Sequence, residues 1–147
     1  MTDVQPTRTL GAILYERFGL LDACGPLEMF GSVGPELRIV TVAEKAGSIT
    51  SVQGPKTVAD HDFANCPKLD LILLPGGFGT VEQLGNTALH AFLRDRAKSA
   101  EVTMSVCSGS AILAKAGLLD GRRATSNKQW FDLARMQSAN VDWVTEA

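Results

Sequence analysis

The stretch VTMSVCSGSAILAKAGLL, residues 102–119, joins a short apolar run to a longer apolar run through one cysteine and three small residues. Its first part, residues 102–106, is typical of a short buried strand. Its last part, residues 111–119, predicts a helix with Gly117 near its end. Cys107 lies between them, so we expect this residue on a sharp strand-to-helix turn, a nucleophile elbow that lifts the side chain out at the carboxyl edge of a sheet.

The remaining sequence alternates between strand-like and helix-like segments. Residues 69–74 (LDLILL) form a nearly continuous apolar run stopped by PGGFG at 75–79, the pattern of a central parallel strand buried on both faces. Pro26 fits the first turn of a short helix that ends near Phe30. We also expect strands at 9–14, 37–43, 123–125 and 141–145, two short paired strands within 48–60 that turn at Gly54-Pro55, and helices at 87–100 and 130–136. This alternation predicts an α/β fold with right-handed crossovers, a mostly parallel central sheet and helices on both faces.

Composition and charge narrow the classes of partner. The chain has 147 residues with 14 basic and 16 acidic side chains and no run of one sign, which gives no reason to expect nucleic acid or an anionic membrane as partner. No segment approaches the roughly 20 apolar residues that cross a bilayer, and residues 1–9 lack the apolar core of a signal peptide. We therefore expect a cytoplasmic protein with one domain, 1–147, that acts on a small molecule.

The three cysteines differ in their expected roles. Cys24, Cys66 and Cys107 are odd in number and widely spaced, which argues against a disulfide framework and against a zinc site. An apolar protein more often buries a cysteine as an inert thiol, and we expect this for Cys24 and Cys66. The predicted elbow favours a functional thiol at Cys107.

Groups that assist Cys107 are expected at the same edge of the sheet. Ser108, Gly109 and Ser110 are small, so a substrate can approach the N–H groups that begin the following helix, and these stabilise a thiolate. Gly76 and Gly77 are expected to add backbone donors, completing an oxyanion-type pocket with those of the helix start.

An acidic partner for the thiol is expected from the loop after the first strand. Asp22 lies there and reaches the same edge if that strand is central. A carboxyl beside a thiolate is pushed towards its protonated form and can act as a general acid. Asp22 alternatively caps the helix near Pro26.

The other polar and aromatic candidates are weighed against structural roles. Asn127 and Lys128 are the expected polar groups at the pocket edge. Trp130 and Phe131 are expected in the core, with a lesser alternative in which they line the pocket. Both histidines, His61 and His90, are expected on the surface and outside the catalytic group.

Three motifs resemble the DJ-1/PfpI branch of the class I glutamine-amidotransferase-like superfamily, with the greatest likeness to its isonitrile (isocyanide) hydratase group. They are LLDACGPLEMF at 20–30, LILLPGGFG at 71–79 and SVCSGSAILAKAGLLDGRRAT at 105–125. The resemblance implies a flavodoxin-like three-layer sandwich. It also implies that the family's C-terminal strands and closing helix are absent from this chain, which would then be a fragment or a shortened product.

The resemblance further implies a lyase that needs neither cofactor nor metal and commonly forms a homodimer. Cys107 would be the nucleophile, Asp22 the proton donor, and Gly77 with Ser108 the backbone donors of the pocket, the Ser108 hydroxyl also touching the substrate. The thiolate would attack an isonitrile carbon to give a thioimidate, and water would release an N-substituted formamide.

Two departures from related patterns bear on the activity. Amidotransferase and protease relatives carry a histidine after or downstream of the nucleophile, whereas no histidine follows His90 here. This disfavours glutaminase and peptidase activity. The hydratase-like pattern often has a second threonine followed by His-Trp, where this chain has Ser126 to Gln129 after Thr125, so the substrate stays open.

Other members of the superfamily suggest alternative functions. One is a glyoxalase or deglycase activity on reactive aldehydes, which prefers a histidine near the thiol. Another is a redox-responsive stress protein in which Cys107 oxidises to a sulfinate stabilised by Asp22. Sensor domains of transcription regulators share the fold but carry a helix-turn-helix domain, for which this sequence has no candidate.

Overall fold

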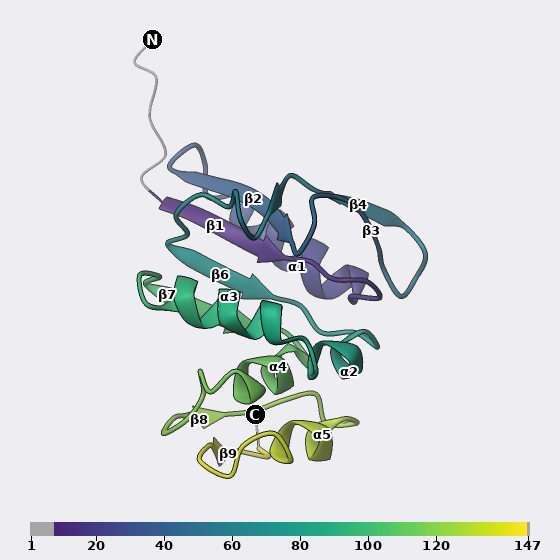
Figure 1. The fold of residues 1–147 in the computed structure, drawn as a ribbon, viewed down its shortest axis with the longest axis vertical. Helices are drawn as coiled ribbons and strands as arrows, with labels where there is room; N and C mark the ends of the chain where they lie inside the picture. Colours follow the sequence, from purple (N-terminus) through teal and green to yellow (C-terminus); the bar gives the residue numbers. More distant parts are fainter. Residues whose placement is uncertain (1–7, 147) are drawn as a thin grey trace.

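A parallel five-stranded sheet forms the centre of the computed structural model, which describes residues 8–146 (Figure 1). Most of the polar stretch 1–9 lies outside the described residues. The sheet order is β5-β2-β1-β6-β7, so the first strand is central, which meets the condition for Asp22 to reach the edge near Cys107. In register, Leu10 of β1 lies between Ile39 of β2 and Leu71 of β6. The strand bounds are β1 Arg8–Ile13, β2 Leu37–Ala43, β5 His61–Asp62, β6 Leu71–Leu74 and β7 Val102–Ser105.

Helices cover both faces of the sheet and form the two outer layers of the sandwich (Figure 1). Leu27 and Phe30 of α1 (Leu20–Gly31) pack against the face that carries Leu10 and Leu73. The opposite face packs against α3 (Thr87–Ala97) and α4 (Gly109–Lys115), and the core there includes Ile13, Ile72, Leu93 and Ile112. Alternate residues of the same strand face opposite layers, so central strands must be apolar throughout. The predicted α/β class and the helices on both faces are confirmed.

Smaller elements complete the described chain. The predicted paired strands within 48–60 are confirmed as an antiparallel hairpin, and the strands and helix predicted after residue 120 are present with slightly shorter bounds. Two short elements, α2 and β5, have no counterpart in the prediction. The bounds are β3 Gly47–Thr50, β4 Lys56–Ala59, α2 Thr80–Gln83, β8 Arg123–Ala124, α5 Phe131–Arg135 and β9 Asp142–Trp143.

The start of α1 differs from the prediction. The helix begins at Leu20, so Pro26 lies inside it and not in its first turn. The side-chain oxygen of Gln53, in the loop that joins β3 and β4, accepts the Leu20 N–H at 2.9 Å. This long-range cap stabilises an earlier start. Asp22 therefore lies on the first turn of α1 and not in the loop after β1.

The carboxyl ends of β1, β6 and β7 meet at one edge of the sheet. Because these strands are parallel neighbours, the segments that follow them converge there: Tyr15–Asp22 after β1, the glycine loop 75–79 after β6, and Cys107 after β7. Ligands of open α/β sheets bind at such an edge.

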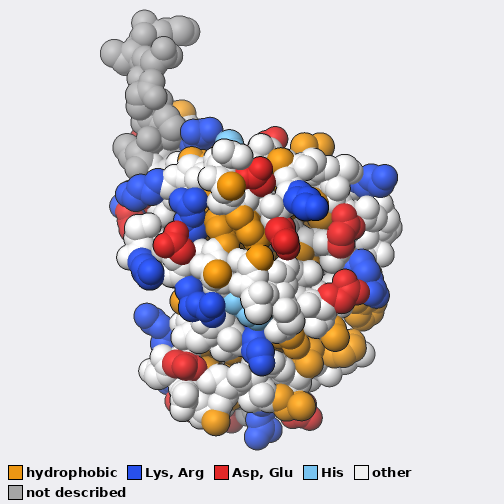
Figure 2. Space-filling model, in the orientation of Figure 1, with side chains coloured by type: hydrophobic (Ala, Val, Ile, Leu, Met, Phe, Trp, Pro, Cys, Tyr) orange, Lys and Arg blue, Asp and Glu red, His pale blue; other side chains and the backbone are white. Residues whose placement is uncertain are grey.

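Charged side chains of both signs are interspersed on the visible face of the molecule (Figure 2). Hydrophobic side chains gather on this face over α2 and α5, to the lower right of the view. Exposed hydrophobic residues of these two regions are Phe78, Val81, Trp130 and Met136.

Two helical glycines, one tightly packed and one not, should respond in opposite ways to substitution by alanine. A Cβ at Gly109 would lie 2.5 Å from the Leu74 carbonyl oxygen and 2.9 Å from that of Pro75. We expect Gly109→Ala to lower the free energy of unfolding by about 1–3 kcal/mol. At Gly25, inside α1, the nearest atom is Leu21 Cδ1 at 3.5 Å, an ordinary contact. Gly25→Ala should raise stability by about 0.5–1 kcal/mol.

Urea unfolding of the three proteins measures both effects. Equal stability of Gly109→Ala and the unchanged protein would contradict the packing described here.

Candidate active site

Cys107 has a left-handed backbone conformation, with φ of 56°. Residues other than glycine rarely adopt it, and it persists only where the surrounding structure enforces it. On one side, the Val106 N–H donates to the Leu74 carbonyl at 3.0 Å; on the other, the Gly109 N–H closes the turn onto the Val106 carbonyl at 3.0 Å. The residue thus stands on a strained strand-to-helix elbow, partly exposed to solvent.

Two serines secure the elbow from below. The hydroxyls of Ser110 and Ser126 lie 3.2 and 3.4 Å from the Cys107 carbonyl oxygen and 2.8 Å from each other. Both side chains are buried. The sequence marks Ser110 only as small, and the contact with Ser126 joins segments 16 residues apart, so no local pattern reveals this pair.

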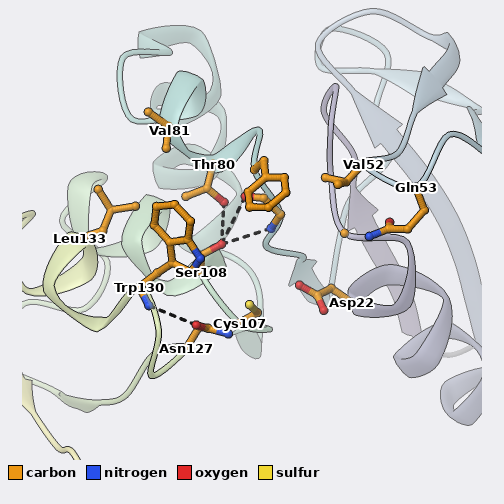
Figure 3. Close-up of a pocket in the computed structure, with 13 residues that line it drawn as sticks. Asp22, Val52, Gln53, Thr80, Val81, Cys107, Ser108, Asn127, Trp130 and Leu133 are labelled. Atoms are coloured by element: carbon orange, nitrogen blue, oxygen red, sulfur yellow. Dashed lines mark hydrogen bonds between the residues drawn. The ribbon is translucent and has the colours of Figure 1, made fainter.

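Asp22 points from α1 towards the sulfur of Cys107 (Figure 3). Its Oδ2 accepts the Gly76 N–H at 3.1 Å. Burial raises the pKa of Asp22, and hydrogen bonds from the Gly76 N–H and the Cys107 thiol oppose that rise. The two groups that the sequence pairs therefore lie close enough for the Cys107 thiol to affect the pKa of Asp22. A carboxyl in this setting can hold or return a proton beside the sulfur.

The glycine loop provides close backbone approach, but its N–H groups have partners within the protein. A Cβ at Gly76 would lie 2.7 Å from the Ser108 nitrogen. Gly77 has φ of 125°, and a Cβ there would collide with the backbone of Arg17 and Gly19. The Gly76 N–H donates to Asp22, and the Gly77 N–H donates to Ser108 Oγ at 3.2 Å. Their role as oxyanion donors stays a prediction.

A pocket of about 200 Å³ opens above the sulfur (Figure 3). Its floor is polar, with Asp22, Cys107, Ser108 and Asn127. Its walls are largely apolar. The other lining residues are Gly19, Val52, Gln53, Gly77, Phe78, Thr80, Val81, Trp130 and Leu133.

Asn127 lies at the pocket edge, where the sequence analysis places it. Its Oδ1 accepts the N–H groups of Gln129 and Trp130 at 2.9 and 3.2 Å. Since the oxygen is used in its own turn, the amide nitrogen is the end left to face the pocket. Lys128 does not line the pocket; its ammonium bonds Thr125 Oγ1 at 2.7 Å and lies over the Phe131 ring.

Trp130 differs from its expected place in the core. It is 38% exposed and lines the pocket, with its ring edge-on to Phe78 at a centroid distance of 6.1 Å. Phe131 is buried, as expected. Sequence reasoning also misses Phe78, Val81 and Leu133, because apolar residues near turns give no signal that separates a pocket wall from the core.

The remaining thiols and histidines lie outside the pocket lining. Cys66 is buried, as expected, whereas the expectation of a buried Cys24 is wrong, because this residue lies on the exposed side of α1. The prediction of a surface position for His90 is wrong: the ring is 6% exposed, and its Nε2 lies 2.9 Å from the Gln83 carbonyl oxygen. Burial lowers the pKa of His90. No histidine, lysine or arginine is among the pocket-lining residues of the described chain.

Within residues 8–146, no group of three or more His, Cys, Asp or Glu side chains is arranged to hold a metal ion. None of the helices in this part of the chain has the length and apolarity needed to cross a membrane.

Comparisons with known proteins agree with the fold. The isonitrile hydratase of Pseudomonas putida is 34% identical over 124 residues, which cover 84% of this chain and 54% of that enzyme. The HTH-type transcriptional regulator GbdR of Pseudomonas aeruginosa is 33% identical over 138 residues, 90% of this chain and 36% of the regulator.

A solved structure and a family model extend the likeness over nearly the whole chain. The crystal structure of a ThiJ/PfpI family protein from Pseudomonas syringae superposes with a TM-score of 0.83 at 34% identity, covering 97% of this chain and 58% of that one. The chain thus spans little more than half the length of that protein and of the hydratase. The model of the DJ-1/PfpI family matches residues 11–147, and this chain belongs to that family.

Proposed function

We propose that this chain carries a cysteine-dependent site that hydrates isonitriles to N-substituted formamides. The observation that carries the proposal is the position of Cys107, on its strained elbow, beside the half-buried carboxyl of Asp22 at the floor of a largely apolar pocket. The likeness to an isonitrile hydratase supports it.

The reaction balances with these two side chains and one water. The Cys107 sulfur bonds to the terminal isonitrile carbon, and the thiol proton reaches the same carbon through Asp22, which gives a thioimidate, R–N=CH–S–Cys. Water then adds to that carbon and one of its protons goes to the nitrogen. The carbon–sulfur bond breaks, and R–NH–CHO leaves as the other water proton returns to the sulfur. Because burial raises the proton affinity of Asp22, it is suited to both transfers.

The pocket walls support a neutral, apolar substituent on the isonitrile. Phe78, Val81, Trp130 and Leu133 surround the space above the floor, and Asp22 is the one charged side chain among the described residues of the lining. Desolvating an anionic or strongly polar substrate there would be unfavourable, since no cation compensates it. A pocket of about 200 Å³ limits the substituent to a small aryl or alkyl group.

The three thiols should differ in their importance for the reaction. Cys107→Ser should abolish formamide production, because the hydroxyl is a far weaker nucleophile at neutral pH. Cys24→Ser and Cys66→Ser should retain most of it, since neither residue lines the pocket. Chromatography of the formamide made from a simple aryl isonitrile measures all four proteins. A folded parent protein that yields no formamide would refute the proposed function, and consumption of a reactive aldehyde instead would favour the deglycase-type alternative.

Asp22→Asn should slow the reaction and stabilise the fold. The amide cannot carry the proton, so we expect kcat to fall on the order of a hundredfold. Because burial raises the pKa of Asp22 in the folded state, this carboxyl favours folding at low pH. That contribution is lost as pH rises from the ordinary value of 3.8 through the raised one. The variant should therefore melt at a higher temperature than the parent at pH 7.

Thermal melts from pH 3 to 8, recorded beside the kinetics, measure how the difference in melting temperature between Asp22→Asn and the parent depends on pH. The advantage of Asp22→Asn should disappear below the ordinary carboxyl pKa, where the parent side chain is also neutral. A constant difference across the range would contradict the assignment to Asp22 ionisation.

Trp130→Ala should weaken binding of an aryl isonitrile and leave the chemical step in place. Loss of the Trp130 ring removes its apolar contact with the substrate and its edge-on contact with Phe78. We expect KM to rise about tenfold, equivalent to ~1.4 kcal/mol. Met136→Ala is the matched control, because Met136 directly follows α5, is 80% exposed and does not line the pocket. Similar KM values for the two variants would argue against the apolar wall as the substrate site.

A further inference from the structure

Three buried hydroxyl groups form a continuous chain that reaches the pocket lining at Thr80 and Ser108. The Tyr15 hydroxyl lies 2.6 Å from the Pro75 carbonyl oxygen and 3.2 Å from Thr80 Oγ1. Thr80 Oγ1 lies 2.9 Å from Ser108 Oγ, which accepts the Gly77 N–H at 3.2 Å. Tyr15, Thr80 and Ser108 are each at most 6% exposed. The chain joins the end of β1 to the glycine loop and to the residue after Cys107 (Figure 3 shows its Thr80–Ser108 part).

The carbonyl at one end fixes the direction of every proton. A carbonyl can only accept, so the single Tyr15 proton is committed to Pro75. The contact between Tyr15 and Thr80 is then a hydrogen bond only if Thr80 donates. With its proton used, Thr80 must accept from Ser108. The Ser108 proton therefore points into the protein, towards Thr80.

If the hydrogen bonds ran in the reverse direction, fewer of the three hydroxyl groups would have a hydrogen-bond partner. If Thr80 donated to Ser108, no proton would be available between Thr80 and Tyr15. Ser108 would be left with its 3.5 Å contact to the Gly77 carbonyl oxygen, which is long for an O–H donor. Burial also raises the pKa of Tyr15, which keeps its proton in place as the end of the chain.

This direction decides what Ser108 offers to the pocket. Its oxygen gives its proton to Thr80 and uses one lone pair for the Gly77 N–H, so one lone pair remains. Since Ser108 lines the pocket, that lone pair is available to a proton donor inside it. Neither the isonitrile group nor its carbon has a proton to donate, whereas attacking water does.

We propose that Tyr15 and Thr80 are positioning residues that hold the Ser108 hydroxyl as an acceptor for the water that breaks down the thioimidate. The inference rests on the proposed hydratase function and assigns the chain of hydroxyls to its second step. Loss of the chain frees the Ser108 proton to turn towards the pocket, where it competes with the water for the same space. Attack by Cys107, which needs no acceptor at Ser108, is unaffected.

The test separates the two chemical steps. Thr80→Val removes the acceptor of the Ser108 proton at nearly constant shape, and Thr80→Ser keeps it. In rapid-quench experiments with an aryl isonitrile, intact-mass spectrometry follows an adduct on Cys107 whose added mass equals that of the isonitrile. We expect Thr80→Val to form the adduct at the parent rate and to break it down about tenfold or more slowly, so that the adduct accumulates.

Rescue and a second site complete the kinetic test. Thr80→Ser should restore breakdown relative to Thr80→Val, and Tyr15→Phe should slow breakdown to a smaller extent, because Thr80 then keeps a hydroxyl but loses its fixed direction. Equal breakdown rates in Thr80→Val and the parent, or a slower adduct formation alone, would overturn the assignment. Melting temperatures of the variants show whether a change merely reflects lost stability.

A measurement without substrate separates this inference from the proposed function. The Gly77 amide proton, which donates to Ser108, should shift in the NMR spectrum of Thr80→Val and of Tyr15→Phe and return towards the parent position in Thr80→Ser. An unmoved Gly77 resonance would refute the directed chain. A parent protein that forms neither adduct nor formamide would refute the hydrolytic role along with the proposed function.

Discussion

Cys107 reaches the edge of the sheet only while its backbone is held in a left-handed conformation, which costs an L-residue about 1–2 kcal/mol. Three sets of contacts enforce that conformation. The register of β6 and β7 fixes Val106, and Gly109 packs against the carbonyls of β6 at a distance that admits no Cβ. The Ser110 and Ser126 hydroxyls hold the Cys107 carbonyl from below. The position of the sulfur is thus a property of the sheet and of α4 together.

The sheet order then brings the other polar groups to the sulfur. Because β6 lies between β1 and β7, its glycine loop is next to both the segment that starts α1 and the elbow. Any side chain at Gly76 would separate Asp22 from Ser108, and at Gly77 it would collide with the start of α1. Because neither glycine has a side chain, the three segments can meet closely enough to bring the Asp22 carboxyl beside the Cys107 thiol. In this structure the glycine N–H groups bind Asp22 and Ser108, so the loop serves first to orient these side chains.

Much of the fold could be predicted because its signals are local. Apolar runs identify the central strands, and a cysteine between a strand and a helix of small residues identifies the elbow. The prediction is wrong where a distant residue decides the outcome. Pro26 suggests a helix start, but the cap from Gln53, 33 positions away from Leu20, moves that start to Leu20 and places Asp22 on the helix. The predicted Asp22, Ser108 and Asn127 do line one pocket, whereas Trp130 and the chain from Tyr15 to Thr80 depend on tertiary packing that no sequence period encodes.

Because no histidine is among the described residues of the pocket lining, a proton carrier there must have its pKa adjusted by burial. Where a histidine serves as proton carrier, its ordinary pKa already lies near neutrality. A carboxyl must be brought closer to that range by its environment, and partial burial of Asp22 does so while the Gly76 N–H limits the effect. The same low polarity strengthens the hydrogen bonds among the Tyr15, Thr80 and Ser108 hydroxyls, which supports the single direction proposed for them. An apolar environment at this edge raises the proton affinity of Asp22, and under the proposed function the same environment would orient Ser108 and favour neutral ligands, three consequences of one physical cause.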